Sequence, residues 1–375
     1  MPTDYRIVNV HLGDRSYPVH IGRDLIPAVA ELIPHDMKGK ILFILTDENA
    51  KPYAEQLQAV LQQKSGAASV FMLPVPPGEE TKTFRWYERI VNWMLDSGVT
   101  RQSVLFTVGG GVVGDLGGFA AATVLRGIGF VQVPTTLLAQ VDSGIGGKTA
   151  IDMPQGKNLV GAFYQPLAVL CDLSTLETLN ARQRLAGYAE IIKYGLINDP
   201  VFFTWLETHG KALCDLEPVE LAEAIEVSCR KKAEIVAADE REEDMRKLLN
   251  LGHTFAHALE VAAGYGEGLL HGEAVAIGLV LAAKLSVRLG HCSDDVVDHI
   301  RDHLKSVGLP CSIRDVAQAV SADPARLVRL MYADKKAEAG GLTFILLKRI
   351  GDAFVARRVP EEEVVAVLNE SIHGA

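Results

Sequence analysis

The chain has 375 residues, of which 48% are hydrophobic and 22% are charged, and its formal net charge is −10 at pH 7. This length exceeds what one hydrophobic core usually serves, so we expect two domains. The acidic balance argues against nucleic acid as a partner, and five scattered cysteines without a Cys-x-x-Cys pair predict reduced thiols. No apolar run approaches the roughly 18 residues of a membrane-spanning helix, and the start of the chain lacks a signal-peptide pattern. We therefore expect a cytoplasmic protein without a membrane partner.

The first half of the chain alternates short apolar segments with helical patterns. A hairpin is expected where YRIVNVHL and SYPVHIG flank Gly-Asp-Arg, and the apolar run KILFILTD predicts a buried strand. Further strands are expected over residues 69–75, 103–108 and 130–134, and helices over residues 48–64 and 86–98. Strands that alternate with helices in this way are typical of a largely parallel sheet with helices on its faces.

After residue 175 the hydrophobic pattern becomes almost wholly helical. Helices are expected over residues 181–197, 218–240, 245–264, 271–290, 294–308 and 323–337. A hairpin is expected over residues 342–359, with its turn near Gly351-Asp352. The sequence therefore predicts an α/β domain over residues 1–175, followed by a mostly helical domain over residues 176–375.

A glycine-rich stretch, VLFTVGGGVVGDLGGFAAAT, follows an expected strand and opens a helix. It contains the spacing G-x-G-x-x-G at Gly109, Gly111 and Gly114, which lets a pyrophosphate approach backbone N–H groups at a helix N-terminus. Tight strand–helix turns also use glycine for packing, so the motif alone leaves both interpretations open. The acidic residue that a standard dinucleotide site places about 20 positions later is missing. Asp47, at the end of an earlier strand, is the better candidate for binding a ribose.

The segment VDSGIGGKTAID ends like a phosphate-binding P-loop but does not match that motif. Gly147, Lys148 and Thr149 supply the final G-K-[ST], whereas the first glycine of the motif would fall on Asp142. A kinase or an ATPase is therefore not expected. We expect either a flexible loop that offers Asp142 and Lys148 to a substrate phosphate or hydroxyl, or a plain glycine-rich turn.

Three histidines lie within 19 positions of one another, close to two glutamates. His253 and His257 are four residues apart on one face of the expected helix, and His271 follows, with Glu260 and Glu273 nearby. A lone histidine on an apolar face is more often a core residue, but three together favour a metal site or acid–base chemistry. A catalytic zinc site takes three protein ligands from His nitrogen and carboxylate oxygen. The spacing resembles that of zinc peptidases, but a threonine replaces their general-base glutamate, which argues against hydrolysis.

A carboxylate from another helix offers a further ligand. Glu190 and Lys193 are three residues apart in RLAGYAEIIKYGLI and share a mostly apolar face. A carboxylate on such a face is costly unless it is paired or bound to a metal. Glu190 is therefore either a metal ligand or one half of a plain salt bridge with Lys193.

Together these segments resemble the motif series of the 3-dehydroquinate synthase family. The resemblance rests on GGGVVGDLGGF, RGIGFVQVPTTLLAQVDSGIGGKTAID, GKNLVGAFYQP, GYAEIIKYG, NLGHTFAHALE, HGEAVAIG and a late DKK, in family order over roughly residues 40–340. It implies an N-terminal α/β Rossmann-like nucleotide-binding domain and a mostly α-helical C-terminal metal-binding domain, in a cytoplasmic homodimer. It also implies NAD and Zn2+ (or Co2+) as cofactors and a phosphorylated sugar acid as substrate.

The resemblance implies a lyase reaction of the shikimate route to aromatic amino acids. The family converts 3-deoxy-D-arabino-heptulosonate 7-phosphate to 3-dehydroquinate and phosphate. NAD transiently oxidises the substrate, phosphate is eliminated, the ketone is reduced again, and an intramolecular aldol reaction closes the ring.

Carried over residue by residue, the resemblance assigns three groups of residues. The metal ligands are Glu190, His253 and His271, so His257 is a neighbour of the substrate. The NAD site is formed by Asp47, Glu79, Lys82, Gly111, Val112, Val113, Gly114, Asp115, Thr135, Thr136, Lys148, Lys157, Thr175, Leu176, Glu177 and Thr178. The substrate contacts are Asp142, Lys148, Asn158, Lys193, Lys232, Arg246, Asn250, His257, Lys335 or the adjacent Lys336, and Arg126, which reaches the phosphate of the neighbouring subunit.

Two kinds of alternative remain open. Another sugar-phosphate cyclase, or a metal- and NAD-dependent polyol dehydrogenase of the same superfamily, would share the scaffold. The segments KYG, NLGHT and DKK fit the dehydroquinate-forming enzyme better. A non-catalytic NAD-binding or regulatory protein would need no metal ligands, so stoichiometric zinc in the purified protein would argue against it.

Overall fold

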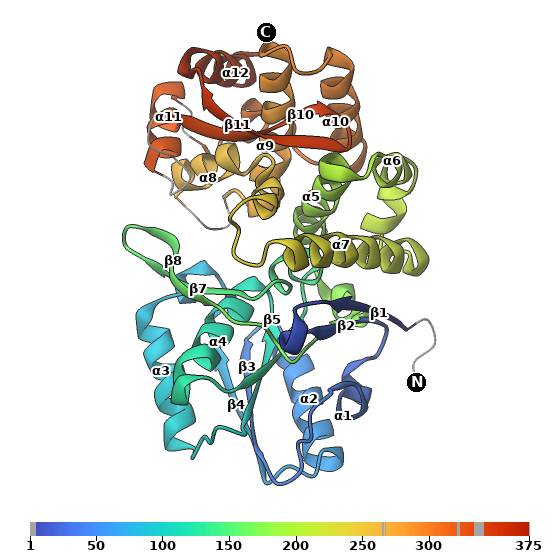
Figure 1. Cartoon of the computed structure of the whole chain (residues 1–375), viewed down its shortest axis with the longest axis vertical. Coiled ribbons are helices and arrows are strands. Elements are labelled where there is room, and N and C mark those ends of the chain that lie inside the picture. The colour runs from blue at the N-terminus through green and yellow to red at the C-terminus, as the bar shows by residue number, and fades with distance from the viewer. Residues whose placement is uncertain (1–4, 265, 267, 321–322, 334–340, 375) are drawn as a thin grey trace. The chain divides into compact units, whose positions relative to one another are not determined.

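The computed structural model describes residues 5–264, 266, 268–320, 323–333 and 341–374. The chain forms two compact units, which Figure 1 shows in colours that run along the chain. The first unit comprises Met1–Asn180 and Leu221–Arg241, and the second comprises Ala181–Glu220 and Glu242–Ala375. The chain therefore passes from one unit to the other near residues 180, 220 and 241.

A seven-stranded sheet forms the centre of the first unit (Figure 1). Its strands, in the order β1-β2-β9-β6-β5-β3-β4, are β1 (Arg6–Val10), β2 (Tyr17–Gly22), β3 (Ile41–Asp47), β4 (Ser69–Val75), β5 (Val104–Gly109), β6 (Gly129–Pro134) and β9 (Ala168–Asp172). The predicted N-terminal hairpin is confirmed, since β1 pairs antiparallel with β2. The other neighbouring pairs, β2–β9, β9–β6, β6–β5, β5–β3 and β3–β4, are all parallel, which confirms the largely parallel sheet.

Helices cover both faces of this sheet. They are α1 (Val29–Leu32), α2 (Lys51–Lys64), α3 (Phe84–Asp96) and α4 (Gly111–Thr123). Side chains alternate along β3, so Leu42 and Ile44 pack with α1 and α2, whereas Phe43 and Leu45 pack with α3 and α4. Because both faces are buried, β3 reads as a continuous apolar run instead of an alternating one.

The carboxyl ends of the central parallel strands lie at one edge of the sheet. The strand β3 ends at Asp47, β5 ends at Gly109 and β6 ends at Pro134, and the strand register places these ends side by side. In open α/β sheets, ligands bind outside this edge. The predicted nucleotide-binding residues that follow these strands are therefore placed where such a ligand would lie.

Residues 141–152 were predicted to form a flexible loop or a plain turn, but much of this segment has regular secondary structure. A π-helical turn covers Ala139–Ser143, and strands β7 (Lys148–Met153) and β8 (Gly156–Phe163) then form an antiparallel hairpin. The turn is confined to the connection before β7, where Gly146 and Gly147 have φ values of 92° and 66°. Glycine therefore marks the entry to a strand here and does not make the whole segment a loop.

The second unit is mostly helical, as predicted. Its helices are α5 (Ala181–Asn198), α6 (Pro200–Cys214), α8 (His253–Ala262), α9 (His271–Arg288), α10 (Asp294–Val307), α11 (Pro324–Ala333) and α12 (Glu361–His373). Strands β10 (Leu342–Arg349) and β11 (Asp352–Val359) form the predicted hairpin. The helix expected over residues 245–264 is interrupted, because a 3-10 helix over Met245–Asn250 ends before Gly252. This glycine has a φ of 79°, a left-handed conformation that a helix cannot continue through.

Helix α7 (Pro218–Ala238) belongs mostly to the first unit. Arg6 on β1 donates hydrogen bonds to Glu223 at 2.8 Å and to Glu226 at 2.6 Å, although these partners are 217 and 220 positions away. Such pairs hold α7 against the N-terminal strands. The division of the chain therefore differs from a single boundary at residue 175, because a helix of the second half packs with the first.

The described residues contain neither a disulfide nor a membrane-spanning helix. All five cysteines are free thiols, and burial raises the pKa of Cys311 to about 11 and that of Cys214 to about 12. Within the described part of the chain, no helix combines the length and apolar character that crossing a bilayer requires.

Candidate functional site

Asp47 lies at the carboxyl edge of the sheet, beside the glycine-rich turn. Its Oδ1 accepts hydrogen bonds from the backbone N–H groups of Asn49 and Ala50, both at 2.9 Å. Its other oxygen faces β5, since a Cβ placed on Gly109 would lie 3.2 Å from Asp47 Oδ2. Burial raises the pKa of Asp47, and the two backbone bonds oppose that rise. The carboxylate is thus fixed in the place where an acidic residue contacts a ribose in folds of this kind.

The N-terminus of α4 adjoins Asp47. Its first residues are the predicted Gly111, Val112, Val113, Gly114 and Asp115. A Cβ on Gly111 would lie 2.9 Å from Ser143 Oγ, so the π-helical turn approaches the start of α4 closely. The first N–H groups of a helix have no acceptor within the helix and carry partial positive charge, which favours a phosphate.

The predicted Thr135 and Thr136 follow β6 and lie against the same glycine-rich turn. Thr135 donates its backbone N–H to the Gly109 carbonyl at 2.9 Å. A Cβ on Gly110 would lie 3.2 Å from Thr136 Cγ2. The structure therefore brings together, at the ends of β3, β5 and β6, a part of the residues that the resemblance assigns to NAD: Asp47, the start of α4, Thr135 and Thr136.

Lys82 is buried and joins α4 to the β7–β8 hairpin. Its Nζ donates to Asp115 Oδ2 at 2.8 Å and to Asn158 Oδ1 at 2.5 Å, and it lies 3.9 Å from Asp152 Oδ1. Burial alone would lower the pKa of Lys82, but the carboxylates of Asp115 and Glu79 outweigh it and raise the pKa. Lys82 therefore stays charged, and it connects two predicted NAD residues with a predicted substrate residue.

Two further contacts extend this cluster. Lys157 Nζ lies 3.6 Å from Glu79 Oε1, so these two predicted NAD residues lie beside Lys82 in the same cluster. The backbone N–H of Asn158 donates to Asp152 Oδ1 at 2.8 Å, and Asn158 has a φ of 56°. The sequence reasoning did not single out Asp152, although it closes the segment VDSGIGGKTAID, because its role depends on the hairpin that this segment forms.

The predicted residues Thr175, Leu176, Glu177 and Thr178 lie in a 3-10 helix, Leu173–Thr178, directly after β9. Thr175 and Leu176 are buried, and Thr175 Oγ1 donates to the Asp172 carbonyl at 2.7 Å. Thr178 Oγ1 lies 2.9 Å from the hydroxyl of Tyr53 on α2, a residue that the sequence did not suggest. The Thr175 hydroxyl therefore holds the end of β9, whereas Thr178 remains a predicted cofactor contact.

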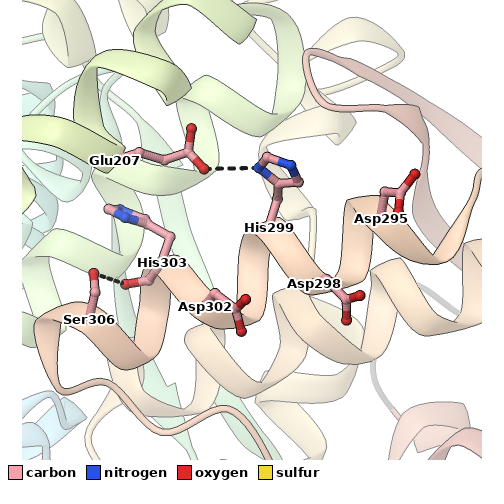
Figure 2. Close-up of a pocket in the computed structure, with 7 residues that line it drawn as sticks. All are labelled: Glu207, Asp295, Asp298, His299, Asp302, His303 and Ser306. Carbon is pink, nitrogen blue, oxygen red and sulfur yellow. Dashed lines mark hydrogen bonds and ion pairs between the residues drawn. The ribbon is translucent and has the colours of Figure 1, made fainter.

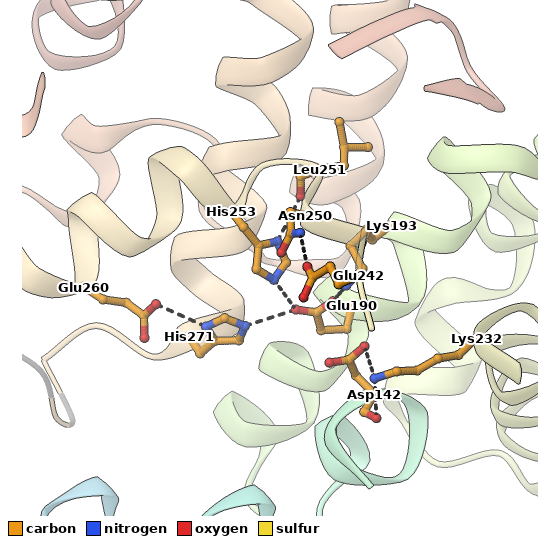
Figure 3. A network of polar contacts seen from close by, with 10 residues as sticks. All are labelled: Asp142, Glu190, Lys193, Lys232, Glu242, Asn250, Leu251, His253, Glu260 and His271. Atoms are coloured by element: carbon orange, nitrogen blue, oxygen red, sulfur yellow. Dashed lines mark hydrogen bonds and ion pairs between the residues drawn. The ribbon is translucent and has the colours of Figure 1, made fainter. Parts of the chain in front are cut away.

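Asp142 and Lys232 come together within the first unit. Lys232 Nζ donates to the Asp142 carbonyl at 2.6 Å and to its Oδ1 at 2.9 Å (Figure 3). The two residues are 90 positions apart, and α7 brings the lysine to the π-helical turn. A nearly buried ammonium held in this way suits the recognition of an anionic substrate group.

Lys148 and Arg126 occupy exposed positions of the first unit. Lys148 is the first residue of β7. Leu125 and Arg126 have φ values of 51° and 69°, which is unusual for two consecutive residues other than glycine. Among the described residues, Arg126 makes no hydrogen bond or ion pair. Strained backbone of this kind persists where a specific function or packing requires it.

Glu190, His253 and His271 converge in the second unit, where α5, α8 and α9 supply one residue each (Figure 3). Their candidate ligand atoms lie within 4.8 Å of one another, and no other such group occurs among the described residues. Glu190 Oε1 lies 3.4 Å from His253 Nε2 and 3.1 Å from His271 Nε2. Lys193 contacts the second oxygen of this fully buried carboxylate. Glu190 therefore has the predicted salt bridge with Lys193, and the same carboxylate also contacts both histidines.

The other ring nitrogens of both histidines face hydrogen-bond acceptors. His253 Nδ1 lies 3.1 Å from the Leu251 carbonyl oxygen, and His271 Nδ1 lies 3.2 Å from Glu260 Oε2 (Figure 3). Each acceptor binds the hydrogen on Nδ1, so Nε2 is the nitrogen left to bind a metal ion, in His271 after it loses its own hydrogen. This is the usual arrangement for metal-binding histidines. Two imidazole nitrogens and one carboxylate oxygen form the donor set of a catalytic zinc site. The residues therefore fit a divalent cation such as Zn2+ or Co2+.

The electrostatics of these residues also fit a cation. Burial lowers the pKa of His253 to about 4. Burial acts in the same direction on His271, but Glu260 and Glu190 outweigh it and raise the pKa of that ring to about 10. Burial would raise the pKa of Glu190, yet Lys193 and His253 hold it well below its usual value. The carboxylates thus favour positive charge between them, and a bound metal ion would provide it.

Close helix contacts fix the spacing of Glu190, His253 and His271. A Cβ on Gly272 would lie 1.9 Å from the Ala186 carbonyl oxygen, so α9 and α5 touch at the residue next to His271. A Cβ on Gly278 would lie 2.2 Å from the Gly252 carbonyl oxygen, so α9 also holds the turn that precedes α8. Only glycine permits backbone contacts this close.

The other predicted substrate residues of the second unit lie near these ligands or in the segment before α8. The rings of His253 and His257 are 5.5 Å apart. Arg246 is buried within the 3-10 helix before α8, and Asn250 Nδ2 donates to Glu242 Oε1 at 2.6 Å. The sequence did not single out Glu242. Lys335 and Lys336 lie outside the described residues.

A separate pocket of about 470 Å³ lies between α6 and α10 in the second unit (Figure 2). It is lined by Glu207, Asp295, Asp298, His299, Asp302, His303 and Ser306. His299 Nδ1 lies 3.0 Å from Glu207 Oε1, and Tyr188 OH lies 2.8 Å from His303 Nε2. None of the residues predicted from the sequence lines this pocket, so it is distinct from the candidate site.

Family comparisons match most of the chain. The families described as 3-dehydroquinate synthase N-terminal and 3-dehydroquinate synthase C-terminal match residues 72–186 and 187–337. A 3-dehydroquinate synthase of Ruegeria pomeroyi is 49% identical over 369 residues, which cover 98% of this chain and 99% of the relative. One of Cereibacter sphaeroides is 50% identical over 367 residues, which cover 97% of this chain and 98% of the relative.

Solved structures share the whole fold. A 2-deoxy-scyllo-inosose synthase complexed with carbaglucose-6-phosphate, NAD+ and Co2+ is 26% identical, with a TM-score of 0.85 over 98% of this chain and 100% of the other. A 2-epi-5-epi-valiolone synthase of Streptomyces hygroscopicus with NAD+ and Zn2+ bound is 29% identical, with a TM-score of 0.85 over 96% and 97%. A probable glycerol dehydrogenase of Sinorhizobium meliloti is 17% identical, with a TM-score of 0.65 over 94% and 96%, and shares the fold alone. From the matched domains and the full-length relatives, the chain belongs to the 3-dehydroquinate synthase family.

Proposed function

We propose that this chain is an NAD- and divalent-metal-dependent lyase that converts 3-deoxy-D-arabino-heptulosonate 7-phosphate to 3-dehydroquinate and phosphate. The observation that carries this proposal is the convergence of Glu190, His253 and His271 in a chain of this family. Relatives with this activity in their names are 49% and 50% identical, whereas the two other cyclases are 26% and 29% identical. The difference favours the dehydroquinate-forming reaction over those of the other cyclases.

The metal ligands are proposed to be Glu190, His253 and His271. A divalent cation held by these residues would supply Lewis acidity to hydroxyl and carbonyl oxygens of the substrate. Glu190 offers a buried negative charge, and the acceptors at both Nδ1 atoms leave the Nε2 atoms to bind. Three protein ligands keep a coordination position for the substrate.

The cofactor is proposed to bind at the carboxyl edge of the sheet. NAD placed there would accept a hydride from the substrate and return it. Asp47 suits the ribose hydroxyls, and the N-terminus of α4 suits the pyrophosphate. Both cyclase structures described above contain NAD+, which supports the assignment.

Cationic and amide side chains are proposed to hold the anionic groups of the substrate. Lys232, Arg246 and Lys193 are buried, and a charged group in a site with little water acts more strongly than one in solvent. An ammonium only donates hydrogen bonds, so Lys82 must bind the amide oxygen of Asn158. The NH2 group of Asn158 then points away from Lys82 and can donate to the substrate. These residues would position the substrate and neutralise its charge.

A product analysis tests this proposal. Metal-loaded protein with NAD should convert the heptulosonate phosphate to equal amounts of dehydroquinate, measured by NMR, and inorganic phosphate, measured by a molybdate assay. Glucose 6-phosphate, which carbaglucose-6-phosphate resembles, serves as the substrate that an inosose-forming cyclase would prefer. Turnover of glucose 6-phosphate alone, or no product from either compound with metal-loaded protein, would contradict the proposal.

We also propose a cytoplasmic homodimer in which Arg126 contacts the phosphate bound by the neighbouring subunit. Arg126 is exposed, has a left-handed backbone conformation and makes no hydrogen bond or ion pair with other described residues of its own chain. A side chain with these properties is suited to contact a ligand of another chain. These features support the arrangement, and a mixing experiment can test it.

Mixing two inactive variants should restore activity if Arg126 acts between subunits. In a hybrid of Arg126→Ala and His271→Ala chains, one site has both the metal ligands and the arginine. A statistical mixture should therefore regain about one quarter of the wild-type activity. A mixture of His253→Ala and His271→Ala is the matched control, because no hybrid site regains both ligands. If native mass spectrometry shows hybrids but no activity returns, Arg126 acts within its own chain.

A further inference from the structure

We infer that Glu260 is a positioning residue that fixes the ring of His271 for metal binding. The inference rests on the metal site of the proposed function and concerns a residue that is not itself a proposed ligand. Glu260 belongs to α8, and its side chain is 7% exposed. Its Oε2 lies 3.2 Å from His271 Nδ1, on the side of the ring that faces away from Glu190 (Figure 3).

The contact fixes the orientation of the His271 ring and requires a hydrogen on Nδ1. An ionised carboxylate only accepts hydrogen bonds, so the ring nitrogen that faces Glu260 must carry a hydrogen. The opposite nitrogen, Nε2, then lies 3.1 Å from Glu190 Oε1, where a cation shared with that carboxylate would be bound. A ring flip would break both contacts at once. Glu260 thereby keeps Nε2, and not a ring carbon, turned toward the proposed cation.

The two histidines differ in how they are held. His253 Nδ1 faces the main-chain carbonyl of Leu251, which no side-chain substitution removes. His271 is the more exposed of the two, with 32% of its side chain accessible against 10% for His253. Its ring therefore depends more on a side-chain partner. A charged partner also makes Nε2 a stronger donor to the metal than a neutral carbonyl would.

Glu273 has a different role although it is closer in sequence to His271. It accepts a hydrogen bond from the Leu270 backbone N–H at 2.9 Å, which caps α9, and its Oε1 lies 2.6 Å from Arg182 Nε. No contact joins Glu273 to the His271 ring among the described residues. Glu273→Gln is therefore a matched control, since it removes a carboxylate from the same region but keeps an acceptor for the cap.

Metal affinity of the purified protein tests the inference directly. Apo protein is titrated with Zn2+ in competition with a chromophoric chelator, and with Co2+ while its visible absorption spectrum is recorded. For Glu260→Ala we expect the Zn2+ affinity to fall by about 10–100-fold and the Co2+ spectrum to change. Glu260→Gln should lose less affinity than the alanine variant, because its amide oxygen still accepts from Nδ1. Glu273→Gln should bind both metals like the wild type.

The outcomes separate this inference from the metal site itself. Wild-type affinity and an unchanged Co2+ spectrum in folded Glu260→Ala would overturn the role of Glu260, while loss of metal in His271→Ala would still support the ligands. If Glu260→Ala does not fold, Glu260→Gln decides, because it has nearly the same shape. An affinity in the glutamine variant equal to that of the wild type would then overturn the inference.

Discussion

Replacing Glu190 with alanine is expected to abolish metal binding and to destabilise the protein. Glu190 is fully buried, contacts both histidines and pairs with Lys193, whose side chain is 1% exposed. Removal of the carboxylate takes away one of three ligands and leaves a buried ammonium without its partner. Loss of one member of a buried ion pair costs about 3–5 kcal/mol. Elemental analysis should find little zinc, and chemical denaturation should show the lost stability.

Variants at the neighbouring positions separate the two effects. His253→Ala and His271→Ala should also lose zinc, but they leave the pair of Glu190 and Lys193 in place and should cost less stability. His257→Ala should keep the metal and lose turnover, because His257 is predicted to contact the substrate and not the cation. Normal zinc content in all three alanine variants of the proposed ligands would overturn the ligand assignment.

Replacing Gly272 with alanine is expected to have a comparably large effect although the substitution adds a single methyl group. The new Cβ would lie 1.9 Å from the Ala186 carbonyl oxygen and 2.3 Å from the Ala186 Cα. Backbone atoms cannot yield as a flexible side chain can, so α9 must move away from α5. We expect a loss of stability on the order of 3 kcal/mol, as for severe overpacking. His271 moves with Gly272, so zinc affinity should fall as well.

Gly268 provides the matched control for this substitution. It lies shortly before α9, and among the residues that the structure describes a Cβ there would meet only Ala319 Cβ at 3.8 Å, an ordinary contact. Gly268→Ala should therefore keep both the stability and the zinc affinity of the wild type. Equal denaturation midpoints and equal zinc affinities for the two alanine variants would show that the contact between α5 and α9 neither stabilises the fold nor positions the proposed ligands.

The sequence predicts the parts of this fold that local patterns encode. The continuous apolar run of β3 indicated a strand buried on both faces, and the glycine-rich stretch indicated a strand that turns into a helix. The spacing of His253 and His257 and the position of Glu190 on an apolar face indicated two of the helices that carry the proposed metal ligands. The choice of His271 over His257 as the third ligand came from the resemblance, since spacing alone allowed either.

Features that depend on contacts between distant residues could not be predicted in the same way. An amphipathic helix such as α7 has the same pattern in either unit, and only partners such as Arg6 place it in the first. The hairpin of β7 and β8 was obscured because glycine and exposed polar residues interrupt its alternation. The orientation of Glu260 toward the His271 ring likewise depends on how α8 packs with α9.

The proposed function is tested most directly by measuring inorganic phosphate and NADH in the same reaction. A polyol dehydrogenase releases reduced cofactor, whereas the proposed reaction oxidises and then reduces the substrate while NAD stays bound. We therefore predict steady phosphate release from the heptulosonate phosphate with no net rise in NADH absorbance, sustained by much less NAD than the substrate consumed. Glycerol should give little reaction, because it has no phosphate for Lys148, Asn158 and Arg126 to bind. NADH formation in proportion to product, or rapid turnover of glycerol, would contradict the proposed function and favour a dehydrogenase.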